Sequence, residues 1–337
     1  MKRDLGKLLF IVCAMVLVAG PFTASSSAQE NLPEDRIGAI GVPEGQIAFI
    51  RGKDVWIMNA DGTDQMMIQE AGNADGRLCW SPDNKRVIFT RSGKVDFKGP
   101  DWLGGFHKVY DLFIASIDSA RNGNTNWFRR VTDDVGSRDP QWTKDEKLLY
   151  YKDMNGNRVN TTEPNYQICM ADTNGLNIEI LRKDWAMMGD RFLISPAINS
   201  AGDIACVYFS ELRPLGLVVL PRDDFMKSMD SLQLQAREHT QCVGPAWSPD
   251  GKWLAYVKND INDPGLYIAT PDLKEKFLVF EPPVGTYLYT VSPSFSPNSK
   301  WLTFSTTDGS IWICDIGGNN AKRISGPGMD KWPAWSN

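Results

Sequence analysis

The chain has 337 residues, of which 42% are hydrophobic and 12 are tryptophan, so it can bury a sizeable core. Its 36 basic and 41 acidic residues give a net charge of −5, and the sequence contains no basic run. This balance disfavours binding to nucleic-acid backbones and mainly supports solubility.

The N-terminus has the pattern of a secretory signal peptide. Basic residues up to Lys7 precede an apolar run over residues 8–19, and small residues up to Ala28 are typical of a cleavage site. The apolar run is too short for a comfortable transmembrane helix. We therefore expect a signal peptide over residues 1–28, a linker over 29–45, and a periplasmic or extracellular protein without a membrane span after cleavage. An uncleaved membrane anchor is the alternative.

From residue 46 onward, degraded copies of one turn motif divide the chain into similar units. The motif is clearest at Trp247–Lys252, Trp-Ser-Pro-Asp-Gly-Lys. Further copies, at intervals of 40 to 62 residues, lie at Trp80–Lys85, Trp142–Lys147, Pro196–Asn199, Phe295–Lys300 and Pro333–Asn337. Repeats of this length are typical of propeller blades.

Each unit reads as four short strands separated by turns. In the clearest unit, a first strand ends on Trp247, and three β-prone runs follow at Trp253–Val257, Leu266–Ala269 and Phe277–Phe280. Proline presets the backbone of the motif turn, while Ser, Asp and Gly suit its tight geometry. Four strands make one propeller blade, and six such units are present.

The two ends of this region complement each other. The unit over Gln46–Gln69 lacks a first strand, and Pro333–Trp335 is a first strand with nothing after it. Together they complete one blade and leave no open sheet edge. The sequence therefore predicts an all-β fold: a six-bladed β-propeller of four-stranded blades over residues 46–337, closed by the C-terminal strand in the N-terminal blade.

The strand order assigns the connections to two faces. The first-to-second and third-to-fourth turns are short and share one face, which we call the short-turn face. The second-to-third loops and the links between blades share the other, which we call the long-loop face. The long insertions fall there, at Ser92–Val109, Asp153–Asn165, Asp184–Arg191 and Glu281–Val291. Long loops on a rigid scaffold are where binding function concentrates.

Candidate partner-binding residues on the long-loop face form three groups. A ring just before each first strand should surround the channel mouth, at Arg77, Asp139, Ser195, Gly244, Ser292 and Trp332, with Arg138 and Lys331 beside it. This ring either solvates the mouth through ion pairs or docks an anionic group or a partner's loop. The longest insertion carries Trp102, Phe106 and His107, which either contact a protein or glycan or cover their own blade. The last insertion carries Tyr287 and Tyr289.

The sequence favours no catalytic residue, metal site or cofactor. Its only two histidines, His107 and His239, fall on different blades, and a metal site needs three or four converging ligands. No nucleophile elbow or zinc-binding His-Glu-x-x-His occurs. After signal cleavage five cysteines would remain, an odd number. Because most of them lie in strand patterns, we interpret them as buried thiols.

The repeats resemble the WD-like repeat of the TolB-type propeller, with the Trp-Ser-Pro-Asp-Gly-Lys turn, a Leu-Ala-Tyr strand at 254–256 and a Leu-Tyr-Ile strand at 266–268. The resemblance covers about residues 46–337 and implies six blades. TolB is periplasmic, and its propeller binds the peptidoglycan-associated lipoprotein. TolB also carries an α/β domain before its propeller, for which we expect no counterpart here. The related oligogalacturonate lyases use a metal-binding histidine cluster that two scattered histidines do not reproduce.

These observations favour a secreted or periplasmic, non-catalytic propeller, expected to be a monomer, that binds a protein partner through the long-loop face. The alternative is a carbohydrate-binding or carbohydrate-active propeller whose Arg77, Arg138 and Lys331 hold acidic sugars at the channel mouth. A purely structural role in a larger envelope assembly is a third hypothesis.

Overall fold

The computed structural model is built almost entirely of β-strands. It describes residues 41, 43–97, 105–134, 136–153, 166–184, 191–210, 213–225, 227, 241–260, 262–288 and 293–337. All of them belong to the unit Arg36–Asn337. The expected signal peptide over residues 1–28 and most of the expected linker lie outside the described residues.

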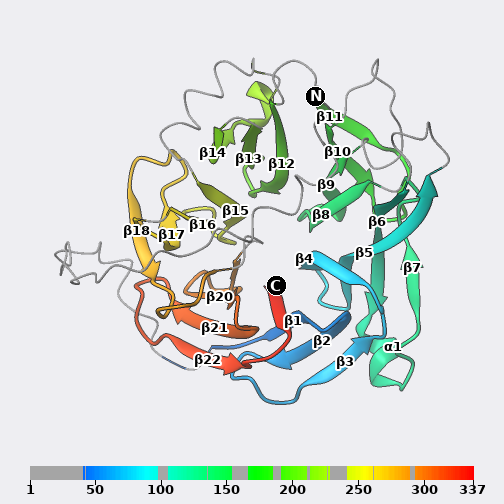
Figure 1. Cartoon of the computed structure of the whole chain (residues 1–337), viewed down its shortest axis with the longest axis horizontal. Coiled ribbons are helices and arrows are strands. Elements are labelled where there is room, and N and C mark those ends of the chain that lie inside the picture. Colours follow the sequence, from blue (N-terminus) through cyan, green and yellow to red (C-terminus); the bar gives the residue numbers. More distant parts are fainter. Residues whose placement is uncertain are drawn as a thin grey trace. The chain divides into compact units, whose positions relative to one another are not determined.

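Antiparallel strands form six sheets around a central axis (Figure 1). We number the sheets as blades in chain order and give the strands of each from the innermost outward. Blade 1 contains β23 (Asp330–Trp335), β1 (Gln46–Arg51), β2 (Asp54–Asn59) and β3 (Met66–Gln69). Blade 2 contains β4 (Ala74–Trp80), β5 (Arg86–Phe97), β6 (Gly105–Ser116) and β7 (Phe128–Arg130). Blade 3 contains β8 (Ser137–Trp142), β9 (Lys147–Asp153), β10 (Tyr166–Asp172) and β11 (Glu179–Asp184).

The remaining blades follow the same order. Blade 4 contains β12 (Arg191–Ile198), β13 (Ile204–Ser210) and β14 (Arg213–Leu220), three strands within the described residues. Blade 5 contains β15 (Cys242–Trp247), β16 (Leu254–Lys258), β17 (Gly265–Ala269) and β18 (Lys276–Phe280). Blade 6 contains β19 (Ser294–Phe295), β20 (Trp301–Thr306), β21 (Ser310–Asp315) and β22 (Lys322–Ser325). Helix α1 (Ile117–Arg121) follows β6, and the 3₁₀ helix η5 (Arg222–Asp224) follows β14. The predicted six-bladed, all-β fold is confirmed.

The ring closes where the sequence predicted. Strand β23 pairs antiparallel with β1, with Ile47 opposite Trp335 and Arg51 opposite Asp330. At the end of this strand pair, the Arg51 guanidinium donates two hydrogen bonds to the buried Asp330 carboxylate, from Nε to Oδ1 and from Nη2 to Oδ2, each 2.7 Å long. The same guanidinium lies over the ring of Trp56, 4.8 Å from its centroid. Backbone pairing of β23 with β1 and the bidentate salt bridge between Arg51 and Asp330 therefore join the two ends of the propeller.

Hydrogen bonds explain why the motif turn recurs. The Ser248 hydroxyl donates to Asp250 Oδ1 over 2.6 Å and accepts from the backbone N–H of Trp253 over 3.0 Å. The N–H of Lys252 donates to the same carboxylate oxygen. The residue between Asp250 and Lys252 is Gly251, with φ +73°, and left-handed backbone also occurs at the matching positions Asn84, Glu146 and Ser299. A side chain that caps its own turn is a local device, so the motif specifies scaffold.

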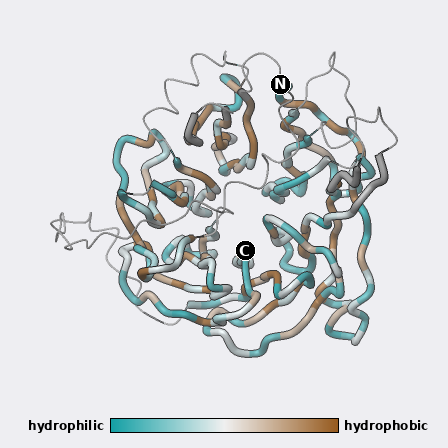
Figure 2. Tube along the Cα trace, viewed as in Figure 1, coloured by the Kyte–Doolittle hydropathy of each residue, from teal (hydrophilic) through white to brown (hydrophobic). Residues whose placement is uncertain are grey.

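The core lies between neighbouring blades. One buried cluster joins blades 1 and 2 and includes Ile57, Trp80 and Phe89. Another joins blades 6 and 1 and includes Trp301 and Trp335. Figure 2 shows the strongly hydrophobic segments on strands and hydrophilic residues on many of the connecting turns. Large aromatic side chains fill these wedge-shaped gaps because they bury the most area per residue.

The five cysteines in the described part of the chain are all free thiols. Cys169, Cys206, Cys242 and Cys314 are buried, which confirms the interpretation as buried thiols for these four, whereas Cys79 is partly exposed. Burial raises the pKa of all four, to about 12 for Cys169 and Cys242 and further for the other two. A buried, protonated thiol is unreactive.

We therefore expect these four thiols to resist a thiol reagent at pH 8 in the native protein and to react after unfolding. We also expect the free energy of unfolding to fall as the pH rises above about 8.5, the ordinary thiol pKa. Above that pH the unfolded chain loses thiol protons that the folded chain keeps, at a cost of up to about 1.4 kcal/mol per pH unit and thiol. Urea titrations at several pH values test this, and Cys169→Ala should reduce the slope. Rapid labelling of Cys169 or Cys242 in the native protein would contradict the expectation.

Candidate functional site

Four of the six first strands carry the same backbone irregularity. In blades 1, 3, 4 and 5, the third residue before the end of the first strand has left-handed backbone at a β-bulge, with φ between +49° and +63°. These residues are Trp332, Asp139, Ser195 and Gly244. The sequence placed them before the first strands, and this placement is wrong: they lie within β23, β8, β12 and β15. Ser292 lies outside the described residues.

Strand β4 departs from this pattern. Two residues, Gly76 and Arg77, separate Asp75 from Leu78, although their partners Thr90 and Phe89 are adjacent. In the other bulges two residues face one residue of the partner strand, so the excess in β4 is larger by one residue. Gly76 takes the left-handed conformation, with φ +71°. The extra residue lets Arg77 extend inward. Leu78 occupies the place of the proline in the other copies, which was the one sign of this departure in the sequence.

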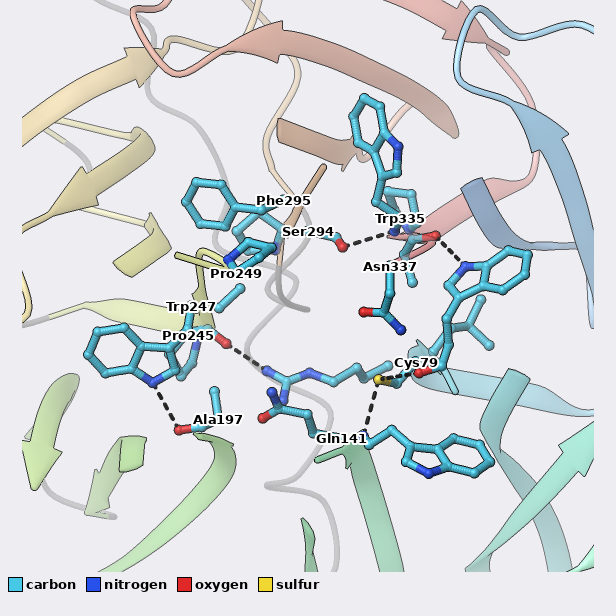
Figure 3. A pocket seen from close by; sticks show the side chains of 18 residues that line it. Cys79, Gln141, Ala197, Pro245, Trp247, Pro249, Ser294, Phe295, Trp335 and Asn337 are labelled. Carbon is cyan, nitrogen blue, oxygen red and sulfur yellow. Dashed lines mark hydrogen bonds between the residues drawn. The ribbon is translucent and has the colours of Figure 1, made fainter. Parts of the chain in front are cut away.

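Arg77 spans the central channel. Its Nη1 donates to the carbonyl oxygen of Pro196 in β12 over 2.7 Å, and its Nη2 donates to that of Pro245 in β15 over 2.8 Å. The residue is 7% exposed. Figure 3 draws the bond that reaches Pro245. Burial lowers the pKa of Arg77, and the charge of Asp139 opposes that shift. The guanidinium thus links blade 2 to blades 4 and 5.

Asp139 extends this polar network to blade 3. One carboxylate oxygen accepts a short hydrogen bond from the Ser195 hydroxyl, and the other would lie 3.3 Å from a Cβ atom placed on Gly76. The network therefore joins the first strands of blades 2, 3, 4 and 5. It contains one buried cation and one carboxylate, which balance each other in a low-dielectric setting.

Arg138 and Lys331 do not share a cluster with Arg77 in this geometry. The Arg138 guanidinium lies 3.5 Å from the ring centroid of Tyr110 and 4.0 Å from a carboxylate oxygen of Asp153. Burial acts to lower the pKa of Arg138, but neighbouring groups, including Tyr110 and Asp153, raise it overall. Lys331 Nζ lies 4.0 Å from the ring centroid of Trp332. Each of these cations already has a partner of its own.

The channel opens into a cavity of about 140 Å³ at the ends of the first strands, toward the short-turn face (Figure 3). Arg77 lines it together with Gln141, Pro245, Ser294 and Asn337. Sequence reasoning missed this cavity, because it assigned the first-strand ends to scaffold alone.

Side chains around this cavity tie neighbouring blades together. At three seams, the side chain of the second-to-last residue of one first strand accepts a hydrogen bond. The donor is the backbone N–H of the last residue of the first strand in the next blade. The accepting and donating residues are Cys79 and Trp142, Gln141 and Ile198, and Ser294 and Trp335. At two other seams an indole N–H donates to a backbone carbonyl, from Trp80 to Ala334 and from Trp247 to Ala197. These bonds make the channel wall a cross-linked ring.

Of the remaining candidate residues, Phe106, His107 and Tyr287 are described by the structure and lie on the long-loop face. Phe106 and His107 are in β6, opposite Asp96 and Val95 of β5, so the expected loop over Ser92–Val109 is largely a β-hairpin. Tyr287 is exposed, and its backbone pairs with Thr307 through two hydrogen bonds of 2.8 and 3.0 Å. Trp102 and Tyr289 lie outside the described residues.

Within the part of the chain that the structure describes, no three His, Cys, Asp or Glu side chains converge as a metal site would require. The same part contains no helix with the length and apolar character needed to cross a membrane.

Solved structures share the fold of this chain at low sequence identity. TolB from Acinetobacter baumannii superposes with a TM-score of 0.60 and 16% identity, over 88% of this chain and 67% of that protein. A putative TolB from Agrobacterium tumefaciens gives 0.55 and 11%, over 88% of this chain and all of that one. The tricorn protease gives 0.54 and 12%, over 86% of this chain and 26% of that protein. No protein-family model and no curated protein sequence matches. The fold is a TolB-type six-bladed propeller.

Proposed function

We propose that the chain is a secreted or periplasmic, non-catalytic propeller that binds a protein partner through its long-loop face. The TolB-type resemblance supports an envelope location and a protein partner. We further propose that the mature protein is a monomer, that residues 1–28 are removed as a signal peptide, and that binding needs no cofactor.

The β5–β6 hairpin carries this proposal. Each of its strands has 12 residues, whereas the second and third strands of the other blades have five to eight. Pairing with β4 reaches only to Arg91, but β5 and β6 remain paired as far as Phe97 and Gly105. A two-stranded ribbon therefore continues past the inner strand of its blade on the long-loop face. Such elaboration of one face of a rigid scaffold is typical of a recognition surface.

The polar groups of the channel support a protein surface over a sugar site. Arg77 uses two of its N–H groups to hold backbone carbonyls of blades 4 and 5, and Arg138 stacks on Tyr110. Both cations therefore act within the scaffold, whereas the ribbon extends beyond it. Its residues Phe106 and His107, with Trp102 at its tip in the sequence, are the candidate contacts.

Pull-down from an envelope extract tests the proposal. The full chain should recover a specific protein, and the triple variant Trp102→Ala/Phe106→Ala/His107→Ala should recover at least about tenfold less. Truncating one interface hot spot costs about 2 kcal/mol or more, and about 1.4 kcal/mol is a factor of ten in affinity. Lys274→Ala is the matched control, since its exposed side chain lies in the third-to-fourth turn of blade 5 on the short-turn face. Equal recovery by the triple variant and the control would contradict the proposed role of the ribbon.

A further inference from the structure

The inner edge of the β5–β6 ribbon has no neighbouring strand among the described residues. Strand β4, which pairs with β5 inside blade 2, begins at Ala74, and its pairing reaches Arg91. One further backbone bond, from the N–H of Ser92 to the Asn73 carbonyl over 2.9 Å, ends this contact. Beyond Ser92, β5 continues to Phe97 with β6 as its one described neighbour. The last part of β5 therefore has an edge, on the side of the central axis, that no described strand covers.

The Ser92 bond determines which backbone groups face this edge. Along an antiparallel strand, successive residues point their N–H and C=O groups to opposite neighbours. Because Ser92 points to the inner edge, Lys94 and Asp96 do so as well, whereas Val95 and Phe97 face β6. The edge thus presents two N–H and two C=O groups in a row, which is a template for another extended chain. These groups specify the chemistry of the occupant as a polypeptide backbone.

The space in line with β4 is open. The link that enters β4 turns away from the ribbon, because the N–H of Gly72 donates to Asp54 Oδ1 of blade 1 over 2.8 Å. Gly72 and Asn73 are exposed, and, apart from its chain neighbours, no described residue has an atom within 4 Å of a Cβ placed on Gly72. At the outer edge of the ribbon, the segment that enters blade 3 already lies against β6 through a parallel bridge of Tyr110 with Gly136. The inner edge is therefore the one with room for an added strand.

We propose that the partner protein adds an extended segment as an antiparallel strand to the inner edge of β5, in line with β4. Its backbone bonds to Lys94 and Asp96, and the ribbon becomes a three-stranded sheet. Strand addition draws its affinity from main-chain hydrogen bonds. A lysine at the edge disfavours pairing between two copies of it, which agrees with the proposed monomer. The inference rests on the proposed function and specifies how the ribbon holds its partner.

A displayed library of random peptides, selected on the full chain, supplies the probe. A synthetic copy of the best peptide should lose at least about tenfold in affinity to Lys94→Pro, because proline removes the N–H that the added strand bonds and its ring fills that position. Lys108→Pro is the matched control. Lys108 lies opposite Lys94 in the ribbon, so its N–H faces the outer edge, and this variant should bind like the wild type. Thermal unfolding shows that both variants are folded.

Two measurements on the unsubstituted chain identify strand addition directly. The bound peptide should slow deuterium exchange at the amides of Lys94 and Asp96, and it should leave those of Val95 and Phe97 nearly unchanged because they already face β6. N-methylation of the peptide, one residue at a time, removes one donor in each case. It should weaken binding by at least about tenfold at every second residue and little at the residues between.

The inference is overturned if no peptide is enriched, if Lys94→Pro and Lys108→Pro bind the peptide equally, or if neither exchange nor N-methylation alternates along the strand. The envelope pull-down separates this failure from that of the proposed function. A partner that the wild type and Lys94→Pro recover equally, while the triple variant recovers less, leaves the proposed function standing and removes strand addition. A peptide whose binding depends on Lys94, with no partner in the extract, removes the proposed function alone.

Discussion

Replacing Arg77 with alanine is expected to lower the free energy of unfolding by about 2–4 kcal/mol. The carbonyl oxygens of Pro196 and Pro245, which accept from the two Nη groups, would lose their donors, at about 1–3 kcal/mol for each buried group left unsatisfied. Asp139 would also lose the cation whose charge faces it. Water entering from the cavity would form hydrogen bonds with these carbonyl oxygens and recover part of the loss. The expected total is therefore smaller than the sum of the costs of the two unsatisfied groups. Urea denaturation measures the effect.

Two further substitutions at this position separate geometry from charge. Arg77→Lys keeps the charge but cannot reach both carbonyls with one planar fork, so we expect a loss of about half that of Arg77→Ala. Arg77→Met keeps most of the volume without the donors and should be nearly as damaging as Arg77→Ala. If all three variants unfold at the wild-type urea concentration, the guanidinium does not hold the channel together.

Replacing Asp330 with alanine is expected to cost about 2–3 kcal/mol and to loosen the closure of the ring. Removing one partner of a buried ion pair typically costs 3–5 kcal/mol, and the value is reduced here because the Arg51 side chain is 30% exposed. In the Asp330→Ala variant, the backbone amides of β23 and β1 should exchange with deuterium faster than those of blades 3 to 5, because the pair of Arg51 and Asp330 joins the two ends of the propeller. Differential scanning calorimetry and hydrogen exchange measure both effects.

Asp133→Ala is the matched control for this closure. Asp133 also pairs with an arginine, Arg130, but its side chain is 82% exposed, and an exposed pair contributes about 0–1 kcal/mol. A double-mutant cycle of Arg51→Ala and Asp330→Ala should give a coupling energy well above that of the exposed pair. If the Asp330→Ala variant loses protection from exchange evenly over all blades, Asp330 stabilises the propeller as a whole and does not specifically hold its two ends together.

The first strands contain both features that the sequence predicts and features that it does not reveal. The roles of Ser248 and Asp250 could be assigned from the sequence because the hydrogen bonds of their side chains stay within six residues of chain. The pairing of β23 with β1 could be predicted because each end lacked what the other supplied. The placement of Arg77 and Asp139 before the strands was wrong, because a β-bulge adds residues without changing the strand pattern. The reach of Arg77 to Pro196 and Pro245 depends on segments 119 and 168 residues away.

The long-loop face shows the same division. The sequence indicated that Ser92–Val109 differs from the other blades, but its composition did not reveal that β5 and β6 stay paired through most of it. Backbone hydrogen bonds on this face join residues near positions 52 and 329, and residues near 287 and 307, and no local pattern encodes them.

By itself the sequence determined the blade count, the closure and the face that carries the insertions, because strand alternation and turn chemistry are local and repeat six times. Only the tertiary structure decided which polar groups meet. Arg77 links blades across the channel through hydrogen bonds instead of acting as an exposed docking cation. Tyr287 pairs with Thr307, 20 residues further along the chain. The physical reason is that hydrogen bonds between blades join residues far apart in the chain, and their geometry follows from how the sheets pack around the axis.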